Sequence, residues 1–109
     1  MTLSRETLQQ LVDRVVRTAR PERIMLFGSA ARGTMTPQSD IDLLVIKSGA
    51  FDRARLTGDI YKSFRGLDCD VEVVVATPEE LERYGASPAL VYWSALREGK
   101  VIYDAVPAG

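Results

Sequence analysis

Apolar positions along the chain follow two periods, and the change from one period to the other predicts the order of secondary-structure elements. From Ser4 to Pro21 apolar residues recur every three or four positions, which is typical of one face of an amphipathic helix. Ser4 is a favourable N-cap, and Pro21 prevents the helix from continuing. The apolar stripe of this predicted helix consists of Leu8, Leu11, Val12, Val15 and Val16.

Start and stop signals predict further helices. One runs from Asp52 to about Phe64. The Thr-Pro-Glu-Glu sequence at 77–80 is a capping box with proline at the first helical position, so we expect a short helix that ends at Gly85. Another helix is expected from residue 87 to a stop at Gly99.

Short and nearly continuous apolar runs predict the strands, because a strand buried on both faces has no polar side. The alternation of these runs with helices predicts an α/β fold, in which a small mixed β-sheet is packed with helices. The predicted strands cover residues 23–27, 40–47 and 67–76, with a short edge strand at 101–103. A short helical turn at 30–32, ended by Gly33, is expected after the first strand.

Polar residues interrupt this pattern at the end of the first predicted strand and at the start of the second. Gly28 and Ser29 follow the first strand, and Asp40 and Asp42 open the second. Side chains two residues apart on a strand point to the same face, so the two carboxylates repel unless a cation lies between them. Oxygen ligands of this kind suit Mg²⁺, which normally arrives with phosphate, and a glycine lets the backbone approach a phosphate closely. The stretch therefore predicts a nucleotide-and-metal site.

The third predicted strand carries two more acids. Alternation places Asp70 and Glu72 on one face and Cys69 on the other, with the apolar residues. Burying an unpaired carboxylate is costly, so acids in otherwise apolar strands are hard to explain by packing. We expect Cys69 to be a small apolar filler.

Composition narrows the function further. The 109 residues predict a single domain, 1–109, and the net charge of −1 argues against a nucleic-acid partner. The sequence contains no histidine, which excludes His-based triads, His-ligated zinc and His general bases. No apolar run is long enough to span a bilayer, the N-terminus does not resemble a secretory signal, and the single cysteine leaves the cytoplasm as the default location.

Gly28-Ser29, ten intervening residues and Asp40-Ile41-Asp42 together resemble the signature of the minimal nucleotidyltransferases of the DNA polymerase beta superfamily, and of the MntA-like antitoxins of HEPN/MNT toxin–antitoxin systems. The segments VVVATPEELERY and ALREGKVIYD are similar to later parts of those proteins, so the resemblance covers nearly the whole chain. It implies a core like the polymerase beta palm.

The resemblance also implies roles for individual residues. Gly28 and Ser29 would hold a triphosphate, and Asp40 and Asp42 would coordinate two Mg²⁺ ions. Arg32 would either reach a phosphate or support the loop. Ser39 is a further candidate for binding the nucleotide, and its hydroxyl would otherwise cap the entry to the second strand.

The third acid of the family falls on the third strand of this chain. Glu72 matches best by its spacing from Thr77, and Asp70 on the same face is the second candidate. The acid would bind the catalytic metal and accept the proton of the attacking hydroxyl. The family usually has Asp there, and the extra methylene of Glu makes catalysis a weaker expectation than the fold.

The implied reaction moves a nucleoside monophosphate from a nucleoside triphosphate, with ATP as the expected donor, onto a hydroxyl. Larger relatives carry an additional helical domain, so we expect a partner to complete the site. The resemblance implies that this partner is a HEPN-type helical toxin and that the acceptor is one of its tyrosines. The alternative is a binding module that neutralises its partner by occlusion, and the oligomeric state stays open.

Overall fold

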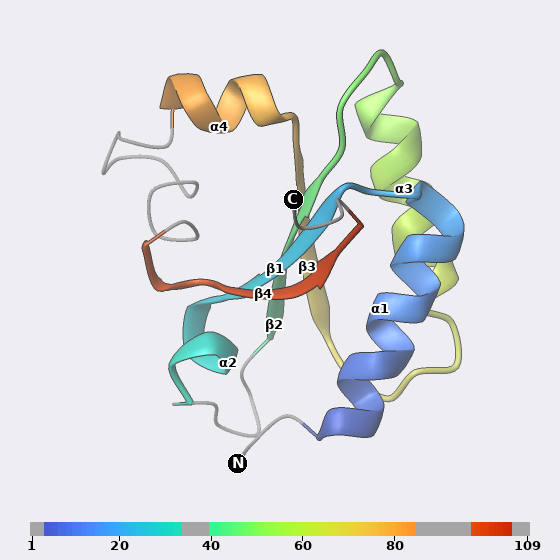
Figure 1. Ribbon diagram of the computed structural model, residues 1–109. Helices are drawn as coiled ribbons and strands as arrows, with labels where there is room; N and C mark the ends of the chain where they lie inside the picture. Colours follow the sequence, from blue (N-terminus) through green and yellow to red (C-terminus); the bar gives the residue numbers. More distant parts are fainter. Residues whose placement is uncertain (1–3, 34–39, 85–96, 106–109) are drawn as a thin grey trace.

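The computed structural model describes residues 4–33, 40–84 and 97–105, and these residues form four strands and four helices (Figure 1). The elements are, in chain order, α1 (Arg5–Ala19), β1 (Arg23–Phe27), α2 (Gly28–Arg32), β2 (Ile41–Ile46), α3 (Arg53–Ser63), β3 (Val71–Ala76), α4 (Pro78–Tyr84) and β4 (Lys100–Asp104). The helix expected from residue 87, apart from Arg97 and Glu98 at its end, lies outside the described residues, as does the predicted stop at Gly85.

The strands form one mixed sheet in the order β3-β2-β1-β4. β1 pairs antiparallel with both β2 and β4, whereas β2 and β3 run parallel. This is the small mixed α/β sheet that the sequence predicts, and the short strand near the C-terminus is an edge strand as expected. The parallel pair brings the starts of β2 and β3 to the same end of the sheet.

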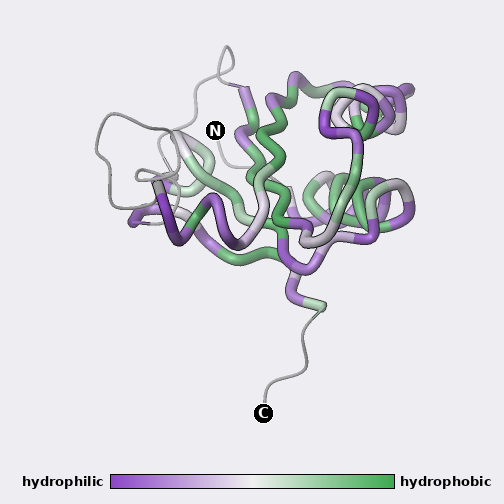
Figure 2. Tube along the Cα trace, turned by 90° about the horizontal axis from the view of Figure 1, so that it is seen from above, coloured by the Kyte–Doolittle hydropathy of each residue, from purple (hydrophilic) through white to green (hydrophobic). Residues whose placement is uncertain are grey.

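The helices lie on both sides of this sheet. α1 and α3 cover one face, and α4 lies over the other, while α2 lies near the end of the sheet where β1 ends and β2 begins (Figure 1). Figure 2 shows hydrophobic residues concentrated in the central strands and hydrophilic residues on the outer turns of the helices. The larger core cluster lies beneath α1 and α3. Its fully buried residues include Leu11, Val15, Ile24, Leu43, Val45 and Ile60.

A smaller core lies on the opposite face of the sheet. It is formed by Met25, Phe27, Leu44, Ile46 and Ala76, with Leu81 of α4 packed against it. Successive strand residues alternate between the two cores, which is why β1 and β2 are apolar at nearly every position. The side chains of Asp42 and Glu72 fall on the face of this smaller core. Each lies one position before a residue of the larger core, Leu43 or Val73, and successive strand side chains point to opposite faces.

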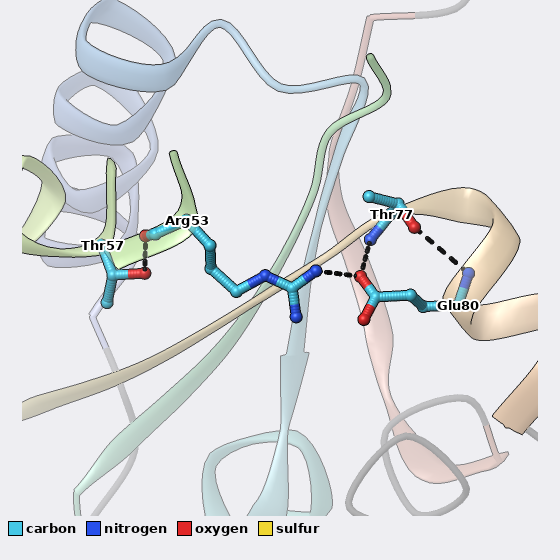
Figure 3. Close-up of polar contacts among 4 residues, drawn as sticks. All are labelled: Arg53, Thr57, Thr77 and Glu80. Carbon is cyan, nitrogen blue, oxygen red and sulfur yellow. Dashed lines mark hydrogen bonds and ion pairs between the residues drawn. The ribbon is translucent and has the colours of Figure 1, made fainter. Parts of the chain in front are cut away.

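Helix caps follow the signals in the sequence. The Ser4 side chain accepts a hydrogen bond from the Thr7 N–H, and Asp52 does the same for Arg55 at the start of α3. The capping box is confirmed: the Thr77 N–H donates to Glu80 Oε1 at 3.0 Å, and the Glu80 N–H donates to Thr77 Oγ1 at 3.2 Å (Figure 3).

The predicted second strand is one residue too long at each end, since β2 is Ile41–Ile46, and two other boundaries are wrong by two residues or more. The third strand begins at Val71 instead of Leu67, because β2 begins at Ile41 and offers no partner beyond that point. Asp70 therefore precedes β3, and its carbonyl accepts a hydrogen bond from the Ile41 N–H at 2.9 Å. The short helix begins at Gly28, two residues earlier than expected, so Gly28 and Ser29 belong to its first turn.

Candidate active site

Gly28 joins β1 to α2 in a conformation that L-amino acids with side chains rarely adopt. Its φ is +68°, in the left-handed region that favours glycine. A Cβ atom built on Gly28 would lie 2.3 Å from Oδ2 and 3.2 Å from Cγ of Asp42. The missing side chain thus makes room for a carboxylate of the neighbouring strand.

Asp42 is held at this point by two strands. It is the register partner of Phe27 in β1 and of Glu72 in β3. Asp42 is half-buried, whereas Glu72 and Asp40 are exposed. The sheet therefore places one carboxylate against the Gly28 backbone and a second on the adjacent strand at the same level.

The electrostatics of Asp42 reflect these neighbours. Burial raises the pKa of its carboxyl above the ordinary value of 3.8, and the negative charges of Glu72 and Asp40 raise the pKa further. The Arg32 guanidinium acts in the opposite direction and lowers it. Like charges thus accumulate at one end of the sheet, and a bound cation would relieve their repulsion.

Arg32 ends α2 beside this acidic group. Its guanidinium forms an ion pair with Glu98 at 2.8 Å, and both side chains are close to half exposed. Arg32 therefore lies near enough to Asp42 to affect its charge while it also contacts the segment that leads into β4. Sequence reasoning missed Glu98, because 66 residues separate the partners and no local pattern connects them.

The two candidates for the third acid differ in their surroundings. Glu72 is the register partner of Asp42 and affects its pKa. Asp70 instead acts on Cys69, whose thiol pKa is raised first by burial and then by the charges of Asp68 and Asp70. The thiol packs against the larger core, as expected for an apolar filler, and the raised pKa keeps it protonated.

The remaining residues of the sequence motif are only partly described. Ser29 is half-buried in the first turn of α2, next to Gly28. Ser39 lies outside the described residues, so the structure does not place its hydroxyl. Asp40, directly before β2, begins the next described segment.

The carboxylates can be assessed as ligands for a metal ion. Within residues 4–33, 40–84 and 97–105, no three Asp, Glu or Cys side chains are arranged so as to hold a metal ion by themselves. Mg²⁺ is usually bound through one or two carboxylates, with phosphate oxygens and water completing its octahedron. Asp40 and Asp42, with the room that Gly28 leaves, therefore fit an ion that arrives with a nucleotide.

Among the described helices, none is long and apolar enough to cross a membrane.

Comparison with known proteins agrees with this geometry. The profile of the nucleotidyltransferase domain family matches residues 8–105, which include the whole sheet and all of the acids above. The chain belongs to this family. Its sheet, helices and motif are thus those of a nucleotidyltransferase, as the resemblance of the sequence implies.

Individual relatives give more detail. The chain is similar to a candidate protein adenylyltransferase of Methanocaldococcus jannaschii, with 34% identity over 86 residues, or 74% of this chain and 57% of that protein. It thus spans little more than half of the length of that relative. The crystal structure of a candidate nucleotidyltransferase from Sulfolobus solfataricus has a TM-score of 0.62 at 21% identity, over 92% of this chain and 82% of the other.

Toxin–antitoxin proteins are also among the structural neighbours. A toxin–antitoxin crystallised with AMP-PNP matches with a TM-score of 0.61 and 25% identity, over 89% of this chain and 73% of the other. A mutant of the toxin–antitoxin MntA-HpeT matches with a TM-score of 0.63 and 21% identity, over the same shares. At 21% identity, the likeness to the MntA-HpeT mutant shows a shared fold.

Proposed function

We propose that this nucleotidyltransferase transfers AMP from ATP to a tyrosine hydroxyl of a HEPN-type helical toxin, with release of pyrophosphate, in a Mg²⁺-dependent reaction, and acts as its antitoxin. The observation that carries the proposal is the acidic group at the start of β2 and β3. Asp42 is held against Gly28, and its pKa is raised by burial and then by the charges of Glu72 and Asp40. Such an arrangement is costly for stability and useful for binding cations.

The proposal assigns the following roles in binding and catalysis to individual residues. Asp40 and Asp42 would bind two Mg²⁺ ions, which neutralise phosphate charge when bound. Glu72, with Asp70 as the second candidate, would complete the acid set and accept the proton of the attacking hydroxyl. Gly28 and Ser29 would contact the triphosphate, and Arg32 would hold a phosphate oxygen or keep the following loop in place. Ser39 would cap the entry to β2.

The donor and the acceptor are supported by the relatives. The neighbour crystallised with AMP-PNP is a toxin–antitoxin, and the relative from Methanocaldococcus jannaschii is named for protein adenylylation. Transfer of AMP to a protein hydroxyl is therefore the reaction that agrees with both. A helical partner would also supply acceptor recognition, for which larger relatives use an additional domain.

The mass of the partner tests this proposal. The co-purifying or neighbouring-gene partner is incubated with this chain, ATP and Mg²⁺, and its intact mass is compared with that after incubation with a variant carrying Asp40→Asn and Asp42→Asn. A gain of one or more AMP units on a tyrosine, absent with the variant, is expected. Peptide mapping that places AMP on another residue type would contradict the tyrosine assignment.

A second candidate function is a binding module that silences its partner by occlusion. One observation favours it: the third acid is Glu72, which is one methylene longer than the Asp that the family usually has there, and its side chain is exposed. Under this alternative the partner gains no mass, and the double variant silences it as well as the wild type does. Neutralisation by the variant thus separates the two functions.

A further inference from the structure

Among the described strands, β3, which carries Glu72, has a hydrogen-bonded neighbour along one side only. It stands at the end of the order β3-β2-β1-β4. The Ile41 N–H donates to the Asp70 carbonyl, and the Lys47 N–H donates to the Ala76 carbonyl, at 2.9 and 3.0 Å. Because a parallel strand directs every second residue's backbone groups to one neighbour, the even-numbered residues face β2 and the odd-numbered residues face outward.

Tyr61 of α3 reaches this outer side of β3. The Val73 N–H donates a hydrogen bond to Tyr61 Oη at 2.8 Å. The Tyr61 ring packs edge-on against Phe64, with centroids 6.4 Å apart and an interplanar angle of 85°. Phe64 is 9% exposed and belongs to the larger core, whereas Tyr61 is 42% exposed. The ring is therefore held by a core residue, and its hydroxyl is presented to the strand.

The hydrogen bond acts on the peptide unit that begins at Glu72. The carbonyl of Glu72 and the N–H of Val73 belong to the same planar unit, so fixing the N–H also fixes the orientation of the bond from the Glu72 Cα. The opposite side of the strand at this level is held by β2, where Glu72 is the register partner of Asp42. Tyr61 and β2 thus hold the Glu72 backbone from two sides.

We infer that Tyr61 is a positioning residue for Glu72: its hydroxyl holds the β3 backbone so that the Glu72 carboxylate stays opposite Asp42. This inference rests on the proposed function, in which Glu72 completes the acid set. Misplacement of a catalytic group by about 1 Å can cost on the order of 10²-fold in rate, so an edge strand that carries such a group benefits from an anchor.

The test compares Tyr61→Phe with Tyr103→Phe. Both substitutions remove one hydroxyl, but Tyr103 lies on β4 at the opposite edge of the sheet, where it pairs with Ile24. Three quantities are measured: amide hydrogen exchange at Val73 without metal or nucleotide, the Kd for Mn²⁺ alone by electron paramagnetic resonance, and kcat and KM for ATP in AMP transfer.

We expect Tyr61→Phe to accelerate exchange at Val73, to weaken Mn²⁺ binding and to lower kcat, the last two by about 3- to 10-fold, with KM for ATP changed by less than about twofold. Tyr103→Phe should leave all of these quantities at wild-type values. Unchanged exchange at Val73 would overturn the inference. So would faster exchange with wild-type Mn²⁺ affinity, because the bond would then serve the strand edge alone.

The same measurements distinguish a failure of the proposed function from a failure of the inference about Tyr61. If the wild type binds Mn²⁺ but transfers no AMP, the proposed function fails, whereas exchange and Mn²⁺ affinity still decide the role of Tyr61. If the wild type binds no Mn²⁺ in the absence of nucleotide, the Kd is measured instead for Mn²⁺ together with a non-hydrolysable ATP analogue, because the acids fit an ion that arrives with a nucleotide.

Discussion

The two ends of the parallel β2–β3 pair both carry carboxylates, but in opposite surroundings. Beyond the end of β3, Glu80 accepts hydrogen bonds from the Thr77 N–H and from the Arg53 guanidinium (Figure 3). The bond from Arg53 is the main reason that the pKa of Glu80 lies below its ordinary value of 4.5. At the start of the pair, burial and the neighbouring acids raise the pKa of Asp42 instead.

The ionised carboxylate of Glu80 thus stabilises the fold, whereas that of Asp42 destabilises it. The charge of Glu80 is matched by a cation and by a backbone N–H, so its ionised form favours the folded state. The charge of Asp42 is opposed by those of Glu72 and Asp40, so its ionised form disfavours the folded state. Repulsion of this kind is expected where a cation has to bind.

The largest expected effect comes from removing the charge of Asp42. Asp42→Asn keeps the shape of the side chain against Gly28 but removes a ligand, so AMP transfer should fall by about 10³-fold or more. The free energy of unfolding at pH 7 should rise, because a half-buried charge and its repulsion by Glu72 and Asp40 are lost. Transfer assays and urea denaturation check the two halves. A variant that loses stability and activity together would show that Asp42 is a structural acid like Glu80.

The next effect comes from filling the space beside Asp42. Gly28→Ala places a Cβ 2.3 Å from Asp42 Oδ2 at a φ of +68°, so we expect a loss of about 2–4 kcal/mol in the free energy of unfolding. AMP transfer should fall as well, because the carboxylate has to move.

Gly33→Ala is the matched control for this substitution. Gly33 has a φ of +72°, but no atom of the described residues lies within 4 Å of a Cβ built on it. The variant therefore carries the backbone strain without the contact, and we expect a loss of about 1–2 kcal/mol with no direct effect on the acids. Equal losses from the two variants in urea denaturation would mean that the approach of Gly28 to Asp42 is unimportant.

Local signals in the sequence predicted much of the fold. The limits of β1, the N-cap Ser4 and the capping box at Thr77 all depend on residues within a few positions, and each is confirmed. The predicted start of the third strand at Leu67 is wrong for a non-local reason. Alternation continues through 67–70, but a strand needs a partner, and β2 offers none before Ile41.

The candidate site was predictable in its residue types and less so in its contacts. The Gly-Ser and Asp-Ile-Asp spacing named Gly28, Asp40 and Asp42, and their roles stay predictions. The contact of Gly28 with Asp42 depends on the pairing of β1 with β2, and the ion pair of Arg32 with Glu98 joins distant parts of the chain. Such contacts follow from sheet register and tertiary packing, which no local pattern contains.

A smaller effect is expected at the satisfied end of the strand pair. Glu80→Ala removes the acceptor for both the Thr77 N–H and Arg53, so the free energy of unfolding should fall by about 1 kcal/mol. Glu79→Ala is the control, since Glu79 lies exposed in the same first turn of α4 and contributes only a few tenths of a kcal/mol through the helix dipole. AMP transfer should be unchanged in both. Loss of AMP transfer in Glu80→Ala would mean that Glu80 also affects the acids at the other end of the strand pair.

The smallest effect, and the one that tests the comparison most directly, is the pH dependence of stability. The pKa of Glu80 is lowered in the folded state, so its stabilisation is present above its ordinary pKa of 4.5 and is lost as the pH falls through the lowered value. The pKa of Asp42 is raised, so its contribution is most favourable below its ordinary pKa of 3.8 and is lost as the pH rises through the raised value. The stability gained by Asp42→Asn should therefore be present at pH 7 and shrink towards zero near pH 3. The loss in Glu80→Gln, which keeps the size of the side chain but not its charge, should also be present at pH 7 and shrink as the pH falls below 4.5. The two differences from wild type, measured by urea denaturation from pH 3 to 7, should thus have opposite signs at neutral pH and converge in acid; differences of the same sign would mean that the acids at the two ends are held in the same way.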